Sequence, residues 1–172
     1  AEPSLLDDSF NRSLVLLCEH NPQGSVGFIM NKPLHIPIYD ALEDFPKFDA
    51  MLYYGGPVQR DSVYFLHRLG DVIPDSKHIY DDLYWGGNMK VLKALIESGD
   101  CKPGQVRFFL GYSGWSEGQL NDEVQEKAWI NLEYPSFSVM ETRAQDLWKK
   151  ALLEFGDKYK LWLNTPSNPN LN

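Results

Sequence analysis

The stretch from Arg12 to Pro33, RSLVLLCEHNPQGSVGFIMNKP, decides the fold of this chain. It is apolar at every position from Leu14 to Leu17, which is typical of a strand buried on both faces. Asn21 to Gly24 fits a type I turn, with Asn first, Pro second and Gly fourth. The returning strand is expected over 25–31, where Gly27 indicates a bulge or a close backbone approach. The stretch therefore predicts a β-hairpin.

The rest of the chain repeats such patterns. Strands are expected over 51–54, 62–66, 106–110 and 128–133, and the first two are expected to pair through the turn Gly55, Gly56, Pro57. Helices are expected over 37–45, 88–99, 120–126 and 147–156, with Asn88 as an N-cap and Gly99 and Gly156 as stops. Because strands follow one another largely as hairpins with helices inserted between them, the pattern indicates an α+β fold.

The bulk composition limits the class of protein. With 172 residues, 43% of them apolar, the chain suits one domain spanning 1–172 rather than two. Its 24 acidic residues outnumber the 16 Lys and Arg residues and give a net charge of -8. A protein that binds DNA needs a basic face, because counterion release supplies most of the non-specific affinity. Direct nucleic-acid binding is therefore disfavoured.

Cysteine usage and hydropathy bear on the compartment. The two cysteines, Cys18 and Cys101, cannot form a disulfide framework, and neither lies in a CxxC motif, which favours a reducing compartment. No apolar run approaches the roughly 18 residues of a membrane span, and no signal-peptide pattern is present. We therefore expect a cytoplasmic protein that does not engage a membrane.

Five phrases of the sequence follow one another in a recognisable order: SFNRSLVLLCEH, GSVGFIMNKPL, YYGGPV, FLH and RFFLGYSGWSEGQL. In this order they resemble the signature of the YqgE/AlgH family of bacterial proteins, and the likeness covers nearly the whole chain. The resemblance implies an α+β fold in which a largely antiparallel sheet closes into a small barrel-like core flanked by helices. Members of the family have another strand ahead of the segment that begins here at Ala1, and we expect that strand to be missing or truncated.

The resemblance implies less about function. No enzymatic activity, ligand or cofactor is established for the family, and we expect no cofactor here. Its members are often labelled transcriptional regulators through genetic association. Because the chain is acidic, we expect a regulatory effect to pass through a protein partner or a small molecule rather than through operator DNA.

Cys18, Glu19 and His20 are residue types that enzymes and metal sites use. Side chains alternate along a strand, so Cys18 and His20 are expected on one face and Glu19 on the other. A zinc site needs about four converging ligands, and no CxxC or HxxxH motif arranges them here. The apolar run before Cys18 predicts a buried, inert thiol. We therefore expect no metal site and no Cys–His catalytic pair, only hydrogen bonds from Glu19 and His20 where the strand leaves the core.

The phrase GYSGW, Gly111–Trp115, resembles the G-x-S-x-G nucleophile elbow of hydrolases and makes Ser113 a candidate nucleophile. Two observations oppose this: Trp115 replaces the last glycine, and all four histidines, at positions 20, 35, 67 and 78, precede the serine. The YqgE/AlgH resemblance adds that the family commonly has alanine at this serine. Acidic residues that follow leave the loop little attraction for phosphate. We expect a glycine-rich turn over which Trp115 packs, with Gln119 bonding the backbone.

Two further groups are candidate sites. The loop 55–57 fits a turn with positive φ, and the same loop is a candidate binding loop. His67 follows its apolar strand as His20 follows the first one. If the two strand ends lie side by side, His20, His67, Glu19 and Asn31 line one polar cleft. This hypothesis fails if the two imidazoles lie at opposite ends of the sheet.

The leading interpretation is a YqgE/AlgH-like protein without enzymatic activity that binds a protein or a small molecule and acts indirectly in regulation. One alternative is a hydrolase-like enzyme that uses the region of His20 and His67, so the sequence leaves enzymatic activity open. A second alternative is a regulator that binds DNA directly, which the net charge of -8 disfavours. The sequence does not name the ligand, the partner or the oligomeric state.

Overall fold

The computed structural model describes residues 1, 9–133, 135, 138–156 and 159. These residues form eight strands and four α-helices. In chain order the elements are β1 (Val15–Asn21), β2 (Gly24–Ile29), β3 (Pro33–Pro37), α1 (Ile38–Ala41), β4 (Met51–Tyr54), β5 (Val58–His67), β6 (Lys77–Tyr80), β7 (Leu83–Trp85), α2 (Met89–Ser98), β8 (Val106–Ser116), α3 (Gln119–Gln125) and α4 (Ala144–Glu154). A short 3-10 helix, η1 (Gly70–Val72), lies between β5 and β6.

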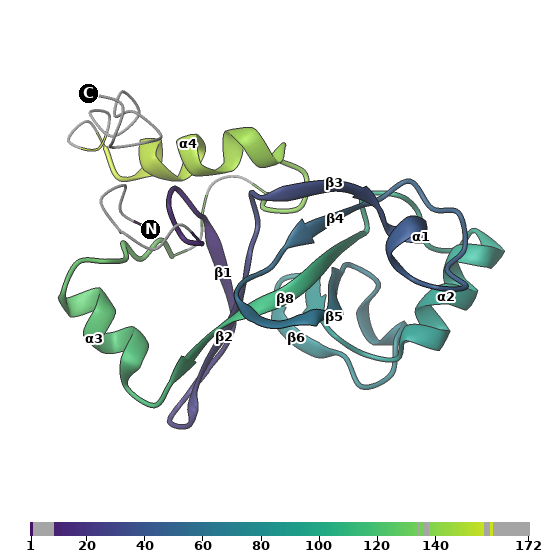
Figure 1. Ribbon diagram of the computed structural model, residues 1–172, viewed down its shortest axis with the longest axis horizontal. Coiled ribbons are helices and arrows are strands. Elements are labelled where there is room, and N and C mark those ends of the chain that lie inside the picture. Colours follow the sequence, from purple (N-terminus) through teal and green to yellow (C-terminus); the bar gives the residue numbers. More distant parts are fainter. Residues whose placement is uncertain (2–8, 134, 136–137, 157–158, 160–172) are drawn as a thin grey trace.

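The long strand β8 organises the sheet (Figure 1). The order along the main path is β1-β2-β8-β5-β7-β6, and β3 and β4 branch from it because β4 pairs with both β3 and β8. Every pairing is antiparallel except that of β4 with β8. The sheet curves until it nearly closes into a barrel, with the helices outside it. The α+β class, with a largely antiparallel, barrel-like core flanked by helices, is thus confirmed.

The centre of β8 divides the apolar core in two. Phe108 and Phe109 are fully buried, and as neighbours on a strand they point to opposite faces. Phe108 packs in a cluster with Leu92 of α2, whereas Phe109 packs in a second cluster with Phe28 of β2 and Leu147 of α4. Each buried ring contributes about 1.5–3 kcal/mol to the free energy of unfolding. β8 is therefore the strand on which both halves of the core depend.

The predicted hairpin is present as β1 and β2. Its register shifts between Leu17 and Glu19, so Cys18 is the extra residue of a bulge. Gly27 is the partner of Leu17, and a Cβ atom on it would lie only 2.6 Å from the carbonyl oxygen of Leu16. The bulge and the close backbone approach that the sequence indicated therefore occur together.

The burial predicted for the first strand is wrong. β1 is the edge strand of the sheet, and among the described strands it pairs only with β2. Leu14, Val15 and Leu16 are partly buried, and Leu17 is 37% exposed. The apolar run therefore lies along a sheet edge instead of inside the sheet.

Four other predictions differ from the structure. The segments 51–54 and 62–66 do not pair with each other, because β8 lies between β4 and β5. The glycine-rich phrase after Leu110 is not a turn, because β8 continues through it to Ser116. The segment 128–133 forms no strand in the described structure, and α1 is a single turn, shorter than 37–45.

The helix α2 begins and ends as predicted. The Asn88 side-chain oxygen accepts the backbone N–H groups of Lys90 at 3.0 Å and of Val91 at 3.3 Å, which caps the first turn. Gly99 ends the helix with a φ of 80°, a left-handed conformation that glycine adopts without strain. α4 likewise buries the predicted stripe at Leu147 and its neighbours one turn on.

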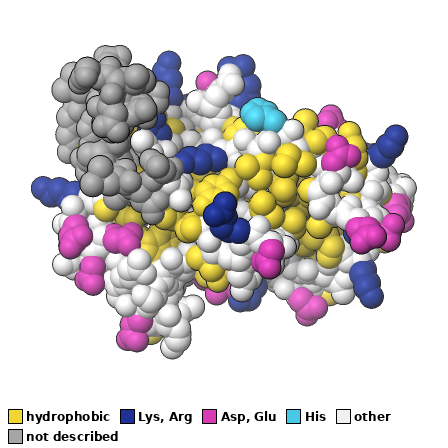
Figure 2. All heavy atoms as spheres, in the orientation of Figure 1, with side chains coloured by type: hydrophobic (Ala, Val, Ile, Leu, Met, Phe, Trp, Pro, Cys, Tyr) yellow, Lys and Arg dark blue, Asp and Glu magenta, His cyan; other side chains and the backbone are white. Residues whose placement is uncertain are grey.

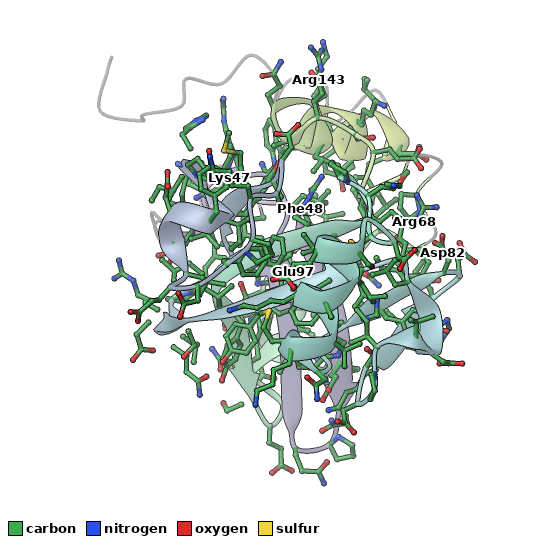
Figure 3. All side chains as sticks on the ribbon, turned by 90° about the vertical axis from the view of Figure 1, so that its right-hand side faces the viewer. Lys47, Phe48, Arg68, Asp82, Glu97 and Arg143 are labelled. Carbon is green, nitrogen blue, oxygen red and sulfur yellow. The ribbon has the colours of Figure 1, made fainter. Side chains whose placement is uncertain are left out.

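Two arginines attach the segment before α4 to the sheet. The Arg68 Nε atom lies 2.7 Å from Asp82, beside which Figure 3 places it, and Arg68 Nη1 lies 2.6 Å from Glu141. Arg107 is buried on β8 and donates a 3.0 Å hydrogen bond to the carbonyl oxygen of Met140. These contacts hold the chain ahead of α4 against the end of the sheet where β5 finishes.

Candidate functional site

The structure does not bring His20 and His67 together. His67 is paired with Val106 at the start of β8, whereas His20 is paired with Ser25, which in turn is paired with Trp115 near the end of β8. The nine-residue step from Val106 to Trp115 spans up to about 30 Å at roughly 3.3 Å per residue. The polar cleft proposed from the sequence is therefore not formed, and a catalytic pairing of these two imidazoles is excluded.

His67 is a fully buried structural residue. Its Nδ1 accepts the backbone N–H of Leu69 at 3.4 Å, so its Nε2 carries the proton and donates to the Ser76 hydroxyl at 2.9 Å. That hydroxyl donates onward to the carbonyl oxygen of Ile73 at 2.7 Å. Burial disfavours the imidazolium and lowers the pKa of His67 from 6.5 to about 4. The neutral ring thus fastens the turn after β5 and has no exposed face for a substrate.

Glu19 and Asn31 also have structural partners. Glu19 forms an ion pair with Lys77 of β6. The Asn31 side-chain oxygen accepts the backbone N–H of Leu14 at 2.9 Å, and its amide nitrogen donates to the carbonyl oxygen of Arg12 at 2.8 Å. Asn31 therefore fastens the entrance of β1 to the end of β2.

The Cys18–His20 triplet does not alternate in the simple way predicted, because the bulge at Cys18 interrupts the strand. Cys18 packs against the core cluster of Phe109, whereas His20 is exposed and its Nδ1 lies 2.7 Å from the Ser25 hydroxyl. Burial, and after it the charge of Glu19, raises the pKa of the Cys18 thiol far above its ordinary value. Such a thiol is a poor nucleophile at neutral pH.

Ser113 lies inside β8 and is fully buried. Its hydroxyl donates a 3.0 Å hydrogen bond to the carbonyl oxygen of Gly55, so the strained turn that exposes the serine of a hydrolase is absent at this position. The loop 55–57 crosses directly over β8: a Cβ on Gly55 would lie 2.2 Å from the Gly111 oxygen, and one on Gly56 would lie 2.3 Å from that of Tyr112. These glycines allow two backbones to touch and leave no space for a ligand between them.

Trp115 and Gln119 belong to a polar cluster built around Glu123. One Glu123 oxygen accepts the indole N–H groups of Trp115 at 2.8 Å and of Trp129 at 2.7 Å. The other accepts the Gln119 amide at 2.9 Å, while the Gln119 oxygen accepts the backbone N–H of Ser116 at 3.0 Å. The predicted bond from Gln119 to the backbone is present. The cluster fixes α3 to the end of β8.

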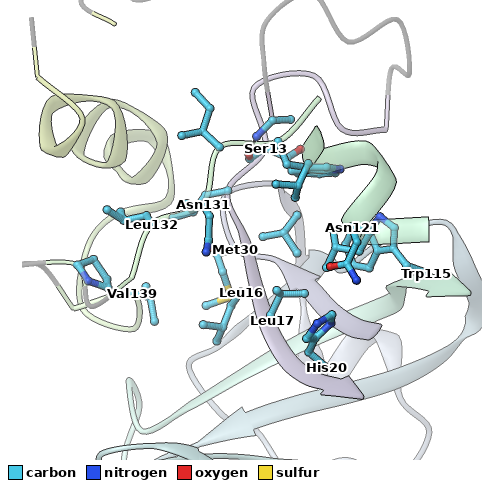
Figure 4. A pocket seen from close by; sticks show the side chains of 18 of the residues that line it. Ser13, Leu16, Leu17, His20, Met30, Trp115, Asn121, Asn131, Leu132 and Val139 are labelled. Carbon is cyan, nitrogen blue, oxygen red and sulfur yellow. Dashed lines mark hydrogen bonds between the residues drawn. The ribbon is translucent and has the colours of Figure 1, made fainter. Parts of the chain in front are cut away.

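Beside this cluster a cavity of about 430 Å³ opens along β1 (Figure 4). It lies between β1, α3, the extended segment 129–132 and Val139. Apolar side chains dominate its lining: Leu14, Val15, Leu16, Leu17, Met30, Leu120, Val124, Ile130, Leu132 and Val139. The described lining contains no Asp, Glu, Lys or Arg; its polar members include His20, Asn121 and Asn131. The size and composition are those of a site for an apolar ligand or an apolar segment of a partner.

The sequence interpretation missed this cavity, although its walls left a signal. The pattern of Leu14 to Leu17 predicts a strand buried on both faces, and that of 128–133 predicts a further strand. Neither is enclosed by the sheet: Leu17 is 37% exposed, and Val124 on the adjacent helix is 40% exposed. Apolar residues that remain at the surface beside a cavity mark it as a binding surface.

Other surfaces of the described structure offer fewer groups for binding or catalysis. Figure 2 shows hydrophobic side chains gathered over the region of β3, β4 and α1, where Ile36, Tyr39 and Met51 are 41%, 39% and 44% exposed. In the described part of the chain, no three His, Cys, Asp or Glu side chains converge as metal ligands would. None of the described helices has the length and apolar character to cross a membrane.

Comparisons with known proteins agree with this fold. A family model described as AlgH-like matches residues 1–160. A UPF0301 protein of Chlorobaculum parvum is 42% identical over the whole chain, which covers 92% of that relative. A UPF0301 protein of Cytophaga hutchinsonii is 43% identical, again over the whole chain and 95% of the relative.

Two solved structures resemble the chain. The solution structure of the AlgH protein from Pseudomonas aeruginosa superposes with a TM-score of 0.75 at 26% identity, over 96% of this chain and 90% of that one. The crystal structure of protein DIP2367 from Corynebacterium diphtheriae gives a TM-score of 0.74 at 20% identity, over 95% and 87% of the two chains, and bears on the fold alone. From the family model and the full-length relatives it follows that this chain belongs to the AlgH-like family.

Proposed function

We propose that this chain is a binding protein without a catalytic centre, and that its binding site is the apolar cavity along β1. The cavity itself carries this proposal: about 430 Å³ is lined by apolar side chains with a few polar groups at its edges. Leu17 and Val124 are exposed at this site, where a ligand would cover them.

The positions and contacts of the candidate catalytic residues support the same proposal. Ser113 and His67 are buried in bonds to the chain itself, and the thiol of Cys18 is held protonated by its surroundings. His20 is exposed, but its described side-chain partner is a serine hydroxyl, and the cavity it lines contains no carboxylate in the described residues. Among the candidate residues that the structure describes, an acid, a base and a nucleophile are not brought together at one place.

A regulatory role of this protein would be indirect. The net charge of -8 opposes binding to DNA, so regulation is proposed to pass through whatever occupies the cavity. The two free thiols suit a reducing compartment, and we place the protein in the cytoplasm. Retention of a random DNA fragment in a gel shift at low salt would contradict this part of the proposal.

The test uses a neutral apolar dye, Nile red, whose fluorescence rises in an apolar site. We expect saturable binding to the native protein, and at least tenfold weaker binding to the Val124→Glu variant, which places a charge at the cavity. The matched control is Val72→Glu: Val72 is 61% exposed and lies on η1, outside the cavity lining. Equal binding by both variants would place the dye elsewhere and reject the cavity as the site.

The native ligand requires a separate measurement. Native mass spectrometry of protein taken directly from its host cells reports bound ligand, metal and stoichiometry together. A bound apolar molecule or peptide that Val124→Glu loses and Val72→Glu keeps would support the proposal. A ligand that both variants retain would show that the protein binds through another surface.

A further inference from the structure

We infer that the cavity is an acceptor site for an extended, apolar segment of a partner protein, which pairs with the free edge of β1 as an added strand. This inference rests on the proposed function, because it names the class of molecule that the cavity binds. It is argued from four observations: the edge of β1 that no described strand covers, the path of the cavity, the opposite wall that no described strand pairs, and the charge of the adjacent helix.

The edge of β1 is available for pairing. Among the described strands β1 pairs only with β2, so no described strand lies against the N–H and C=O groups on its other side. An exposed strand edge is the surface to which extended peptides add in β-augmentation. Sheet edges of this kind are often shortened or covered by charged residues, whereas Val15, Leu16 and Leu17 carry none.

The cavity follows this edge. Four consecutive residues, Leu14 to Leu17, line it, although neighbouring side chains of a strand point to opposite faces. On one side the lining includes Met30 and Val139, and on the other Trp115 and Asn121, as Figure 4 shows. A cavity that meets both faces of one strand runs along the strand's edge. Leu14 to Leu17 presents about 13 Å of edge, at roughly 3.3 Å per residue.

The opposite wall also lacks a strand partner. The segment 129–132 has the alternating pattern that predicts a strand, yet it forms no ladder with any described strand. Residues of β1 and of 129–132 line the same cavity, so an extended peptide in it would offer hydrogen-bonding groups to both walls. A small apolar molecule in the same place would remove the β1 edge from water without pairing it, which is unfavourable. A polypeptide strand therefore fits the site better than a lipid-like ligand.

The charges around the cavity specify the partner further. The described lining carries no Asp, Glu, Lys or Arg, so the inserted part of the partner should be uncharged. The adjacent helix α3 carries Asp122 and Glu123, and Glu126 and Lys127 follow it, so residues 119–127 carry a net charge of -2. Basic residues that flank the apolar segment would therefore be attracted. The expected partner segment has about four apolar residues in extended conformation between Lys or Arg residues.

The test uses synthetic peptides on the chain as it exists. The first peptide is Lys-Val-Ile-Val-Leu-Val-Lys with blocked ends, and two control peptides carry N-methyl groups on alternate backbone amides in either phase. Methylation keeps the apolar side chains and removes the strand's hydrogen-bond donors. We expect the first peptide to displace Nile red and to slow hydrogen exchange of the β1 amides at least tenfold. Both methylated peptides should bind at least tenfold more weakly.

A protein variant provides the matching test. Leu17→Lys places a positive charge on the β1 edge, and because Leu17 is 37% exposed the substitution is compatible with the fold. It should weaken binding of the basic peptide at least tenfold, whereas the control Val72→Lys should leave it unchanged. Far-ultraviolet circular dichroism of both variants establishes that each is folded.

Each other outcome overturns the inference in a distinguishable way. Equal displacement of the dye by all three peptides shows apolar binding without strand pairing, which leaves the proposed function intact. If the protein binds the dye but no peptide, strand pairing is likewise rejected and the proposed function stays intact. If it binds neither the dye nor a peptide, the proposed function is rejected as well. A concentration-dependent dimer whose β1 amides are already protected assigns the edge to a second copy. The last comparison uses the full gene product, with any residues that precede Ala1. If it binds no peptide while this chain does, a segment of the same polypeptide occupies the cavity.

Discussion

His67 makes stability depend on pH in a way that can be calculated. The ring is fully buried, and its pKa falls from an ordinary value of 6.5 to about 4 in the folded chain. The unfolded chain therefore takes up a proton at this site before the folded chain does. The contribution of neutral His67 to the free energy of unfolding is fully present above about pH 6.5 and is lost progressively as the pH falls towards 4.

The size of the loss follows from the two pKa values. The full difference of about 2.5 pKa units corresponds to about 3 kcal/mol of unfolding free energy at 1.36 kcal/mol per unit. Between pH 7 and pH 5 the expected part is about 2 kcal/mol. Carboxylates contribute to any such acid titration, so the wild-type protein alone does not isolate the histidine.

The His67→Gln variant isolates it. Glutamine can keep a hydrogen bond to Ser76 and has no titration in this range. Urea unfolding of both proteins at pH 7 and pH 5 gives four free energies. The wild type should lose about 2 kcal/mol more than the variant between the two pH values, whatever the variant costs at pH 7. Nuclear magnetic resonance of the ring protons should place the His67 titration near pH 4.

Parallel losses in the two proteins would refute this reasoning. They would mean that His67 accepts a proton in the folded chain as readily as in the unfolded one. Its ring would then be reached by water, and the chain of hydrogen bonds through Ser76 to Ile73 would not confine it.

Two further substitutions and one chemical labelling experiment test the structure. Asn88→Ala removes the cap of α2 and should lower the unfolding free energy by about 1 kcal/mol in urea titration, and an unchanged midpoint would contradict the capping role. Gly55→Ala forces a Cβ to within 2.2 Å of a backbone oxygen and should cost more unfolding free energy than Gly104→Ala, which has open space around it and only the backbone strain of a φ of 89°, about 1–2 kcal/mol. Similar costs would show that the loop 55–57 moves to accommodate the Cβ. A thiol reagent at neutral pH should modify Cys18 far more slowly than it modifies free cysteine, because the pKa of the Cys18 thiol is raised, and labelling as fast as that of free cysteine would contradict this.

Local signals predicted much of this structure. The hairpin of β1 and β2 could be predicted from the sequence because apolar runs flank an Asn-Pro-x-Gly turn, and the runs and the turn lie within a few residues of each other. The helix α2 could be predicted for the same reason, because Asn88 and Gly99 mark its two ends. Capping and turn formation depend on neighbours in the chain, so sequence alone determines them.

Pairings between distant segments could not be derived in this way. β4 and β5 follow each other through a glycine turn, which favours a hairpin, but β8 lies between them. Gly111 and Gly114 were taken as turn residues, although they stand inside β8, where Gly111 lets the strand pass under the loop 55–57. Glycine at a turn and glycine at a backbone crossing look alike in a sequence.

The proposed cleft of His20 and His67 failed for a geometrical reason. Each residue lies at or near the carboxyl end of its strand, and that much was correct. From β1 through β2 and β8 to β5 every neighbouring pair is antiparallel, so β1 and β5 run in opposite directions. Their carboxyl ends therefore lie at opposite ends of the sheet, a fact that depends on the strand order.

Two wrong predictions have one explanation in common. Leu14 to Leu17 should have been buried on both faces and is not, and 128–133 should have been a strand and is not. Residues of both segments line the same cavity. An extended strand between them would bury the first and pair the second, and so would satisfy both patterns at once. The composition of each wall therefore supports a strand as the occupant, independently of the size of the cavity.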